Sequence, residues 1–229
     1  MTTVATSVRS RSIAVLVAVL AGLMLALGVS AREGVVAHAA PGGAIQNRIA
    51  FNQAMRKLWE DHIMWTRLYI VSAESQLPDT SQTATRLFAN QTDIGNAIKP
   101  FYGDAAGNEL TTLLTAHIAI AAEILSDATN PNPTIQARVP QDIADWYANA
   151  DQIATFLHTA NPSNWSFSQM RTMMHTHLQL TLNEAVDRLQ GNYAASIADY
   201  DQVHAEILQM ADMLSSGIIA QFPQDFSNS

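Results

Sequence analysis

Four histidines stand where helical periodicity would turn an imidazole toward the interior of a helical bundle. They are His62, His117, His177 and His204, and apolar residues stand three or four positions before and after each of them. Residues at this spacing share one face of an α-helix. A buried imidazole needs partners for its ring nitrogens, because an unpaired buried polar group costs about 1–3 kcal/mol. These histidines are therefore the first candidates for binding chemistry.

The histidines also fall close to the middle of the helices expected to carry them. Each lies within about three residues of its helix midpoint, and at ~1.5 Å per residue this is a spread of less than one turn. The midpoints of an up-and-down bundle share one height whichever way each helix runs. We therefore expect the imidazoles to form one polar layer in an otherwise apolar core.

Carboxylates near the same height extend this set toward a metal site. Glu184 follows His177 by two turns, Asp201 precedes His204 by one turn, and Asp151 lies beside the apolar stripe of another helix. Histidine and carboxylate ligands without a thiolate suit Zn, Fe, Mn or Cu, and such sites are built inside helix bundles. The predicted metal ligands are His62, His117 and His177, with Asp151, Asp201, His204 and Glu184 as further candidates.

Two alternatives to a bound ion stay open. The chain lacks the H-x-x-x-H and E-x-x-H spacings by which metal sites in bundles are recognised. The histidines can be structural, in a non-enzymatic cell-envelope or interaction protein. A haem-binding protein or a metal-dependent enzyme ranks third. Neither a G-x-S-x-G motif nor a phosphate-binding loop occurs, so no catalytic residue is assigned.

The composition limits the classes of ligand and partner that this protein could bind. The chain has 229 residues, no cysteine and a net charge of −8. Absence of cysteine excludes disulfides, thiolate nucleophiles and Cys-based zinc or iron–sulfur sites. Lys57 and Lys99 are the only lysines and no basic patch occurs, which argues against nucleic acid and anionic membrane surfaces. A metal ion or small ligand is the expected partner, and no protein partner is defined.

The first forty residues are typical of an export segment. Arg9 and Arg11 precede an apolar run over residues 13–29, and Ala37-His38-Ala39 forms an A-x-A cleavage site. An uncleaved anchor is the alternative, although ~1.5 Å per residue gives this run only about 26 Å against a ~30 Å hydrocarbon core. The membrane would then be contacted only through residues 13–29. Either way the sequence predicts an extracytoplasmic protein, with residues 41–229 as a single helical-bundle domain.

The remaining chain predicts an all-α fold. Apolar residues make up 48% and aromatic residues 7% of the sequence, a mixture that favours helices over sheets. Periodicity near 3.6 and the prolines and glycines between segments predict about six helices. Short connections favour antiparallel neighbours and hence an up-and-down bundle. The expected helices cover residues 46–76, 81–99, a segment from the turn at 102–108 to about 127, 140–159, 166–190 and 193–221.

Two short blocks suggest an internal duplication. Residues 88–94 (FANQTDI) resemble residues 147–153 (YANADQI), and residues 114–118 (LTAHI) resemble residues 174–178 (MHTHL). The offsets are 59 and 60 residues. A duplicated central hairpin is one explanation, and chance similarity between helices rich in Ala and Leu is the other.

Three further stretches carry a resemblance to a known family. Residues 58–67 (LWEDHIMWTR), 94–104 (IGNAIKPFYGD) and 146–151 (WYANAD) resemble exported bacterial all-helical proteins of uncharacterised activity, over about residues 58–223. Some members carry a glycosyltransferase label, but six helices without a nucleotide-binding α/β domain would offer no sugar-nucleotide site. The resemblance supports a set of matching positions and departs at His204, where relatives can have an acidic residue. The matching positions are His62, Arg67, His117, Asp151, His177 and Asp201.

Overall fold

The structure, a computed structural model, describes residues 42–227 and is all-α, with no strand within that range. The export segment predicted for residues 1–40 lies outside the described residues and stays a prediction. The elements follow one another as α1 (Gly42–Glu74), α2 (Thr80–Thr129), α3 (Pro133–Gln136), α4 (Val139–Ala160), α5 (Phe167–Leu189), α6 (Tyr193–Gln221) and the short 3₁₀ helix η1 (Pro223–Phe226).

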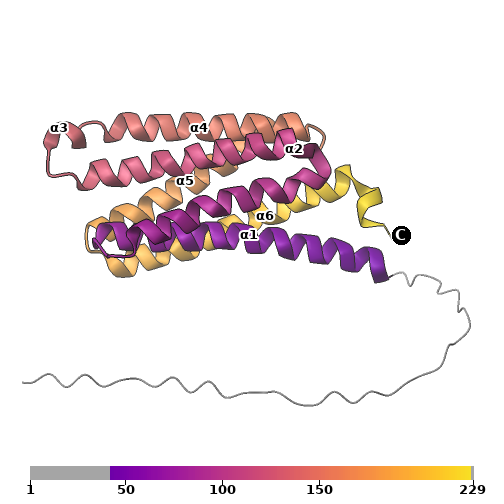
Figure 1. The fold of residues 1–229 in the computed structure, drawn as a ribbon, viewed down its shortest axis with the longest axis horizontal. Coiled ribbons are helices and arrows are strands. Elements are labelled where there is room, and N and C mark those ends of the chain that lie inside the picture. The colour runs from indigo at the N-terminus through magenta and orange to yellow at the C-terminus, as the bar shows by residue number, and fades with distance from the viewer. Residues whose placement is uncertain (1–41, 228–229) are drawn as a thin grey trace, which may run out of the picture. The chain divides into compact units, whose positions relative to one another are not determined.

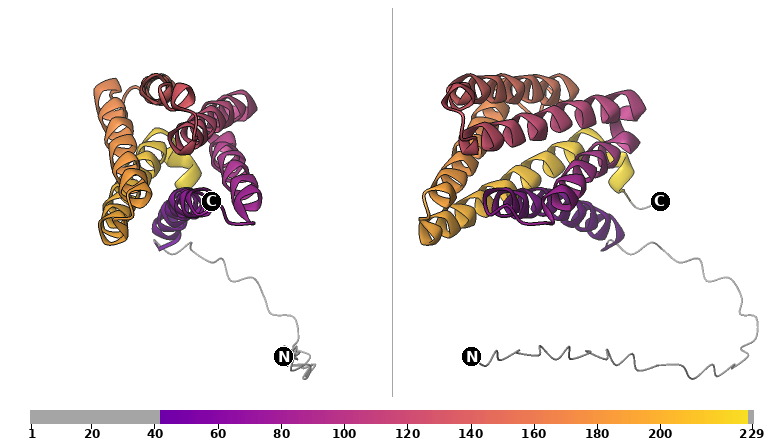
Figure 2. Two further views of the ribbon diagram at one scale, coloured as in Figure 1. Left: turned by 90° about the vertical axis from the view of Figure 1, so that its left-hand side faces the viewer. Right: turned by 60° about the vertical axis from the view of Figure 1, so that its left-hand side comes forward.

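The long helices pack mainly against their neighbours in the chain. α1 packs on α2, α2 on α4, α4 on α5 and α5 on α6, while α6 returns to α1 and closes the ring of contacts. Figures 1 and 2 show these helices lying alongside one another, with α6 between α1 and α5. Each long helix therefore packs against two other helices, and these neighbours cover the apolar stripe of an amphipathic helix.

α2 spans the stretch predicted as two helices, and it contains two helical halves joined by a kink in place of the predicted loop. The backbone of this 50-residue element leaves helical geometry at Gly103, with φ 81° and ψ 170°. Figure 1 shows α2 folding back on itself near this point. A positive φ is readily adopted by glycine, which has no Cβ. One residue thus reverses the chain, and the turn predicted over residues 102–108 is mostly helical.

The two halves of α2 meet through a pair of buried glycines. A Cβ added to Gly95 would lie 2.5 Å from the carbonyl oxygen of Gly107, and one added to Gly107 would lie 2.6 Å from that of Gly95. Real Cβ atoms do not approach a backbone oxygen so closely. The hairpin in α2 therefore depends on backbone-to-backbone contact at this crossing.

The other helix ends lie close to their predicted positions. α1 stops at Glu74, and Gln76 has a positive φ of 52° in the turn that follows. Ser166 caps α5 by accepting a hydrogen bond from the backbone N–H of Gln169 at 3.3 Å. α3 and η1 were not expected. Asn132 caps α3 through the N–H of Thr134, as a polar residue before a short helix can do.

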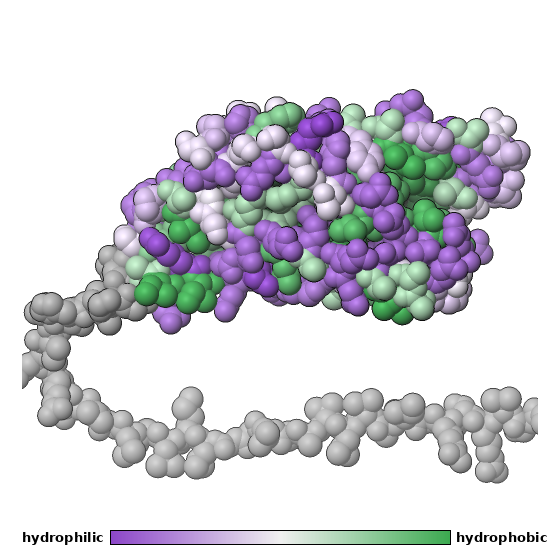
Figure 3. Space-filling model, turned by 180° about the vertical axis from the view of Figure 1, so that it is seen from behind, coloured by the Kyte–Doolittle hydropathy of each residue, from purple (hydrophilic) through white to green (hydrophobic). Residues whose placement is uncertain are grey.

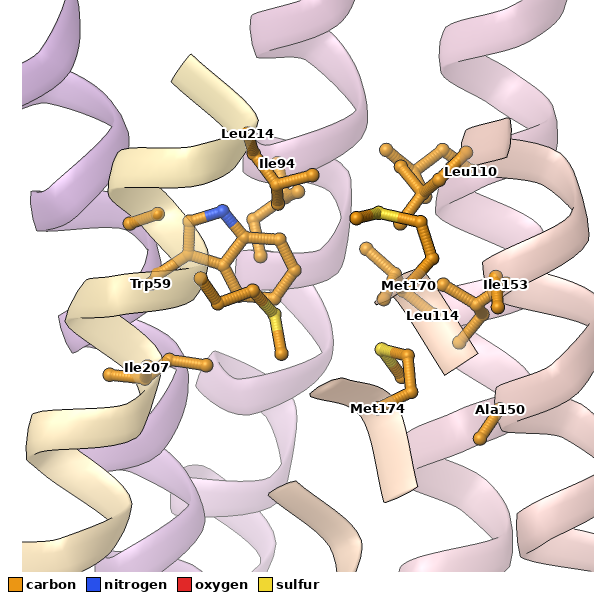
Figure 4. Packing of buried hydrophobic residues seen from close by; sticks show 14 of the residues in the cluster. Trp59, Ile94, Leu110, Leu114, Ala150, Ile153, Met170, Met174, Ile207 and Leu214 are labelled. Atoms are coloured by element: carbon orange, nitrogen blue, oxygen red, sulfur yellow. The ribbon is translucent and has the colours of Figure 1, made fainter. Parts of the chain in front are cut away.

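The core is apolar and contains large side chains from all the long helices. Figure 4 shows Trp59, Ile207 and Leu214 on one side of the interior and Leu110, Ile153 and Met170 on the other. Figure 3 shows polar side chains over most of one face, with apolar ones in separate patches. α2 is long and apolar enough to cross a membrane by length and composition, a test that core helices also pass.

Replacing Gly95 with alanine should destabilise the protein. Gly→Ala in an ordinary helix position stabilises by about 0.5–1 kcal/mol, whereas overpacking against backbone costs about 1–3 kcal/mol. We therefore expect Gly95→Ala to lower the free energy of unfolding, measured by urea denaturation.

Asn96→Ala, on the exposed side of the same helix, is the matched control and should leave the free energy of unfolding unchanged or slightly raised. A Gly95→Ala protein as stable as the Asn96→Ala protein would show that the crossing can open at no cost.

Candidate functional site

Three of the four predicted histidines meet in the interior. His62 on α1, His117 on α2 and His177 on α5 expose only 3%, 2% and 5% of their surface. The ring centroids of His62 and His177 lie 5.8 Å apart, with an angle of 42° between the planes. His117 is near enough to His62 and His177 for their charges to interact. The structure thus brings imidazoles from three helices into one buried group, here called the histidine layer.

The protonated nitrogen of His117 can be assigned from its partner. Its Nδ1 lies 2.9 Å from Oδ1 of Asn149 on α4, and Nδ2 of Asn149 donates to the carbonyl of Leu113 at 3.2 Å. The second bond orients the amide, so Oδ1 is the acceptor and Nδ1–H the donor. The lone pair of the neutral ring is therefore on Nε2. Trp146 packs against this ring, with centroids 5.1 Å apart.

His177 is held in the same way by a carboxylate. Its Nδ1 lies 3.1 Å from Oε2 of Glu206 on α6, whose side chain is only 13% exposed. A carboxylate accepts, so Nδ1–H donates and the lone pair of a neutral His177 ring is again on Nε2.

Glu206 was missed because His204 was expected to face the interior of the bundle. The buried stripe of α6 includes Val203, Ile207, Met210 and Leu214. A helix turns about 100° per residue, so a stripe that passes through Val203 leaves His204 on its solvent side and Glu206 on the side of the core. The apolar spacing from Val203 to Leu214 was the available signal.

His62 faces an amide donor. Nε2 of Gln91 lies 3.3 Å from Nδ1 of His62 and also donates to the carbonyl of Leu87 at 2.8 Å. His62 Nδ1 accordingly accepts, which leaves the proton on Nε2. Oε1 of Gln91 is buried without a hydrogen-bond partner. Rotating the amide would offer that oxygen to Nδ1–H only at the loss of the bond to the Leu87 carbonyl, so the arrangement favours the tautomer with its proton on Nε2.

Burial keeps two of these rings neutral. Desolvation lowers the pKa of His62 well below its usual value, and the neighbouring His177 and His117 lower it further. Desolvation and His177 also lower the pKa of His117, to about 3. A neutral imidazole has a free lone pair, which is the form that binds a metal ion.

Glu184 lies near the histidine layer but is committed to an ion pair. Its carboxylate is 2% exposed and accepts from Nη1 of Arg67 at 2.9 Å. Ser196 accepts from the same nitrogen at 2.6 Å and donates to the backbone carbonyl of Glu184 at 3.0 Å. Burial raises the pKa of Glu184, while Arg67 and then His177 oppose that rise. The ion pair joins α1, α5 and α6 beside the layer.

The remaining predicted ligands are not brought to the layer. Asp151 is hydrogen-bonded to Arg171 at 2.9 Å and to His175 at 2.7 Å. Burial raises the pKa of Asp151, but Arg171 and His175 outweigh burial and hold that pKa below its usual value. His204 is 44% exposed and lies 3.1 Å from Glu60, while Asp201 is exposed. The prediction of a four-histidine layer is therefore replaced by a layer of three.

The imidazoles are near one another without being arranged as a finished ligand cage. In residues 42–227, Glu123, Asp127 and Asp142 form the one group of three or more potential ligands whose atoms all lie within 4.8 Å of one another. The ring nitrogens of the layer do not meet that limit. A single ion bound by all three rings would require these side chains to move closer together.

No protein-family model matches the chain, and no curated protein or solved structure does either. The family resemblance stays a prediction, and the function must be argued from the geometry.

The neutral histidines should make the fold sensitive to acid. A folded pKa below the unfolded value of about 6.5 means that the unfolded chain binds more protons, so stability is present above pH ~6.5 and is lost as pH falls toward the folded pKa. The slope for each such histidine is about 1.4 kcal/mol per pH unit. For His117 this window runs from about 6.5 down to about 3.

We expect His117→Asn to reduce this acid-dependent loss, measured as the free energy of unfolding between pH 7 and pH 5. His204→Gln, which removes a surface imidazole, should retain it. An equal pH dependence in the wild type and the His117→Asn protein would contradict burial of a neutral His117.

Removing Arg67 should destabilise the folded protein, because it would leave the Glu184 carboxylate buried without its partner. Removing one partner of a buried ion pair lowers the free energy of unfolding by about 3–5 kcal/mol, whereas a surface pair contributes about 0–1 kcal/mol. Arg67→Ala should therefore lower the midpoint of chemical denaturation far more than Arg56→Ala. Arg56 pairs with Asp212 at 2.8 Å, with both side chains about two-fifths exposed. Similar losses in the two variants would show that Glu184 is readily solvated or protonated.

Proposed function

We propose that this protein binds one transition-metal ion in the histidine layer, through Nε2 of His62, His117 and His177. Zn, Fe, Mn and Cu are the candidate ions, because the ligands are nitrogens and no cysteine occurs in the chain. The proposal places this site in an extracytoplasmic protein, as residues 1–40 suggest. Metal binding, not catalysis, is the proposed activity.

One observation carries the proposal: Nδ1–H of His117 and Nδ1–H of His177 already donate hydrogen bonds to side chains on neighbouring helices. Histidines that bind metals usually donate their other N–H to a carboxylate or carbonyl, which fixes the tautomer and orients the ring. Asn149 does this for His117 at 2.9 Å and Glu206 for His177 at 3.1 Å. The two Nε2 lone pairs are thus free for a ligand. For His62 to bind through Nε2, Gln91 would have to give up its bond to the Leu87 carbonyl and turn Oε1 toward Nδ1.

The spacing of the rings is compatible with a shared ion. Two imidazoles bound at ~2.0–2.1 Å with a tetrahedral angle between them have centroids roughly 5 Å apart. The centroids of His62 and His177 are 5.8 Å apart. Closing the difference requires the His62 and His177 rings to move toward each other.

A fourth position would be left to water. Glu184 is held by Arg67, and Asp151, Asp201 and His204 lie elsewhere. The cavity beside Trp146 measures about 110 Å³ and is lined mainly by apolar side chains such as Ile118, Ile143 and Leu182. This surrounding favours a binding or storage role over hydrolysis or redox catalysis, which would need a polar substrate pocket. A cavity of about 110 Å³ is too small for haem, which therefore ranks behind a bare ion.

The fold we propose for this role is an up-and-down bundle of six helical segments. It counts the two halves of α2 on either side of Gly103 as separate segments. The neighbour packing from α1 to α6 and the reversal at Gly103 support this description.

The leading alternative is a non-enzymatic envelope or interaction protein with structural histidines. Two observations favour it. The ring nitrogens of the histidine layer do not all lie within 4.8 Å of one another, and Nδ1 of each ring already has a hydrogen-bond partner.

Metal analysis of the mature protein, purified without a histidine tag, tests the proposal. After stripping and separate supplementation with Zn²⁺, Cu²⁺, Fe²⁺ and Mn²⁺, we expect about one equivalent of a single metal to be retained. His117→Ala/His177→Ala should lose it. Glu206→Gln should weaken affinity about 10–100-fold, because an outer partner of a ligating histidine is removed.

His175→Ala/His204→Ala is the matched control, since it also deletes two imidazoles but leaves the layer intact. It should retain the metal. Failure of the wild-type protein to retain any of the four ions, or equal loss in the two double variants, would return the histidines to a structural role.

A further inference from the structure

A second group of potential ligands lies where α2 ends and α4 begins. Glu123 and Asp127 are one turn apart on α2 and share a face, and Asp142 is in the first turn of α4. One carboxylate oxygen from each residue lies within 4.8 Å of the other two. The connection through α3 brings these two helix ends together. This carboxylate group is separate from the histidine layer and shares no residue with it.

Asp142 has a buried oxygen that nothing in the described chain satisfies. The residue is only 8% exposed, and its Oδ2 has no hydrogen-bond partner. It does not cap α4, which begins without a side-chain cap. An ionised carboxylate withdrawn from water without a partner is unfavourable, so such an oxygen indicates a missing ligand. Oδ2 of Asp127, a residue 6% exposed, also lacks a hydrogen bond.

The charges around the group are unbalanced. Arg138 is its cation, pairing with Glu123 and approaching Oδ2 of Asp127 at 3.4 Å. Asp142 has no ion pair among residues 42–227. Three carboxylates and one guanidinium leave a net charge of −2, which one divalent cation would neutralise. Burial raises the pKa of Asp142, repulsion from Asp127, Glu123 and Asp145 raises it further, and Arg138 opposes the rise only in part.

We propose that Glu123, Asp127 and Asp142 bind a calcium ion. The donors are all carboxylate oxygens, which suit hard cations in preference to ions that favour nitrogen or sulfur. Ca²⁺ bonds oxygen at about 2.3–2.6 Å, so oxygens on opposite sides of one ion are about 4.6–5.2 Å apart. The three oxygens therefore fit around one Ca²⁺ with little movement. Water would complete the shell on the side of Glu123, whose side chain is 48% exposed.

The ion would join α2 to α4 across the α3 connection. Apolar side chains such as Ile124 and Ile143 also pack near these ends, and the ion pairs of Arg138 are weak because its side chain is 51% exposed. Calcium binding should therefore stabilise the folded state, because the ion has no comparable site in the unfolded chain.

Calorimetric titration of the chelator-stripped full chain with CaCl₂ tests this site, together with thermal unfolding at each concentration. We expect saturable binding with a dissociation constant of about 10⁻⁴–10⁻³ M, as in extracellular calcium modules, and a rise in melting temperature. Asp142→Asn should weaken binding at least tenfold. Glu123→Gln, at a half-exposed position, should also weaken it and is a second variant if Asp142→Asn does not fold.

Glu109→Gln is the matched control, because Glu109 is exposed on α2, loses the same charge, and lies 14 residues or about 21 Å along the helix from Glu123. It should bind Ca²⁺ like the wild type. His117→Ala/His177→Ala should do so too, which separates this site from the histidine layer. No saturable Ca²⁺ binding up to about 10 mM, well above the expected range, would overturn the proposal. Equal weakening by Glu109→Gln and Asp142→Asn would also overturn it.

Discussion

The polar layer constrains the register of the helices, because each buried ring must meet a hydrogen-bond partner on a neighbouring helix. His62 on α1 meets Gln91 on α2, His117 on α2 meets Asn149 on α4, and His177 on α5 meets Glu206 on α6. A slip of one residue in any pair would move a partner by about 100° and leave a buried polar group unpaired. The layer thus specifies helix pairing that apolar contacts alone would leave less defined.

Two close contacts support this register from either side. The glycine crossing at Gly95 and Gly107 holds the halves of α2 together, and His117 lies on the second half. The Arg67–Glu184 pair, with Ser196, joins α1 to α5 and α6 beside His177. Both contacts are buried and specific in geometry, so they allow little freedom to the helices that carry the histidines.

The structure separates two kinds of ligand environment. The interior has neutral imidazoles surrounded by apolar side chains, which suits a nitrogen-binding ion and lowers the histidine pKa values. The junction of α2 and α4 has carboxylates with excess negative charge, which suits a hard cation. Different ions would therefore be expected at the two places, and neither site depends on the other.

The all-α fold followed from composition and periodicity. The burial of His62, His117 and His177 followed from periodicity, since the 3.6-residue repeat determines which side chains share a face. The sequence also placed most helix ends through its prolines and polar caps. It could not show that Gly103 replaces a loop, that Val203 is buried where His204 was expected, or that Glu206 in place of His204 reaches the interior. Nor could it bring together Glu123, Asp127 and Asp142. These features depend on packing between helices distant in sequence, where a rotation of 100° exchanges a buried side chain for an exposed one.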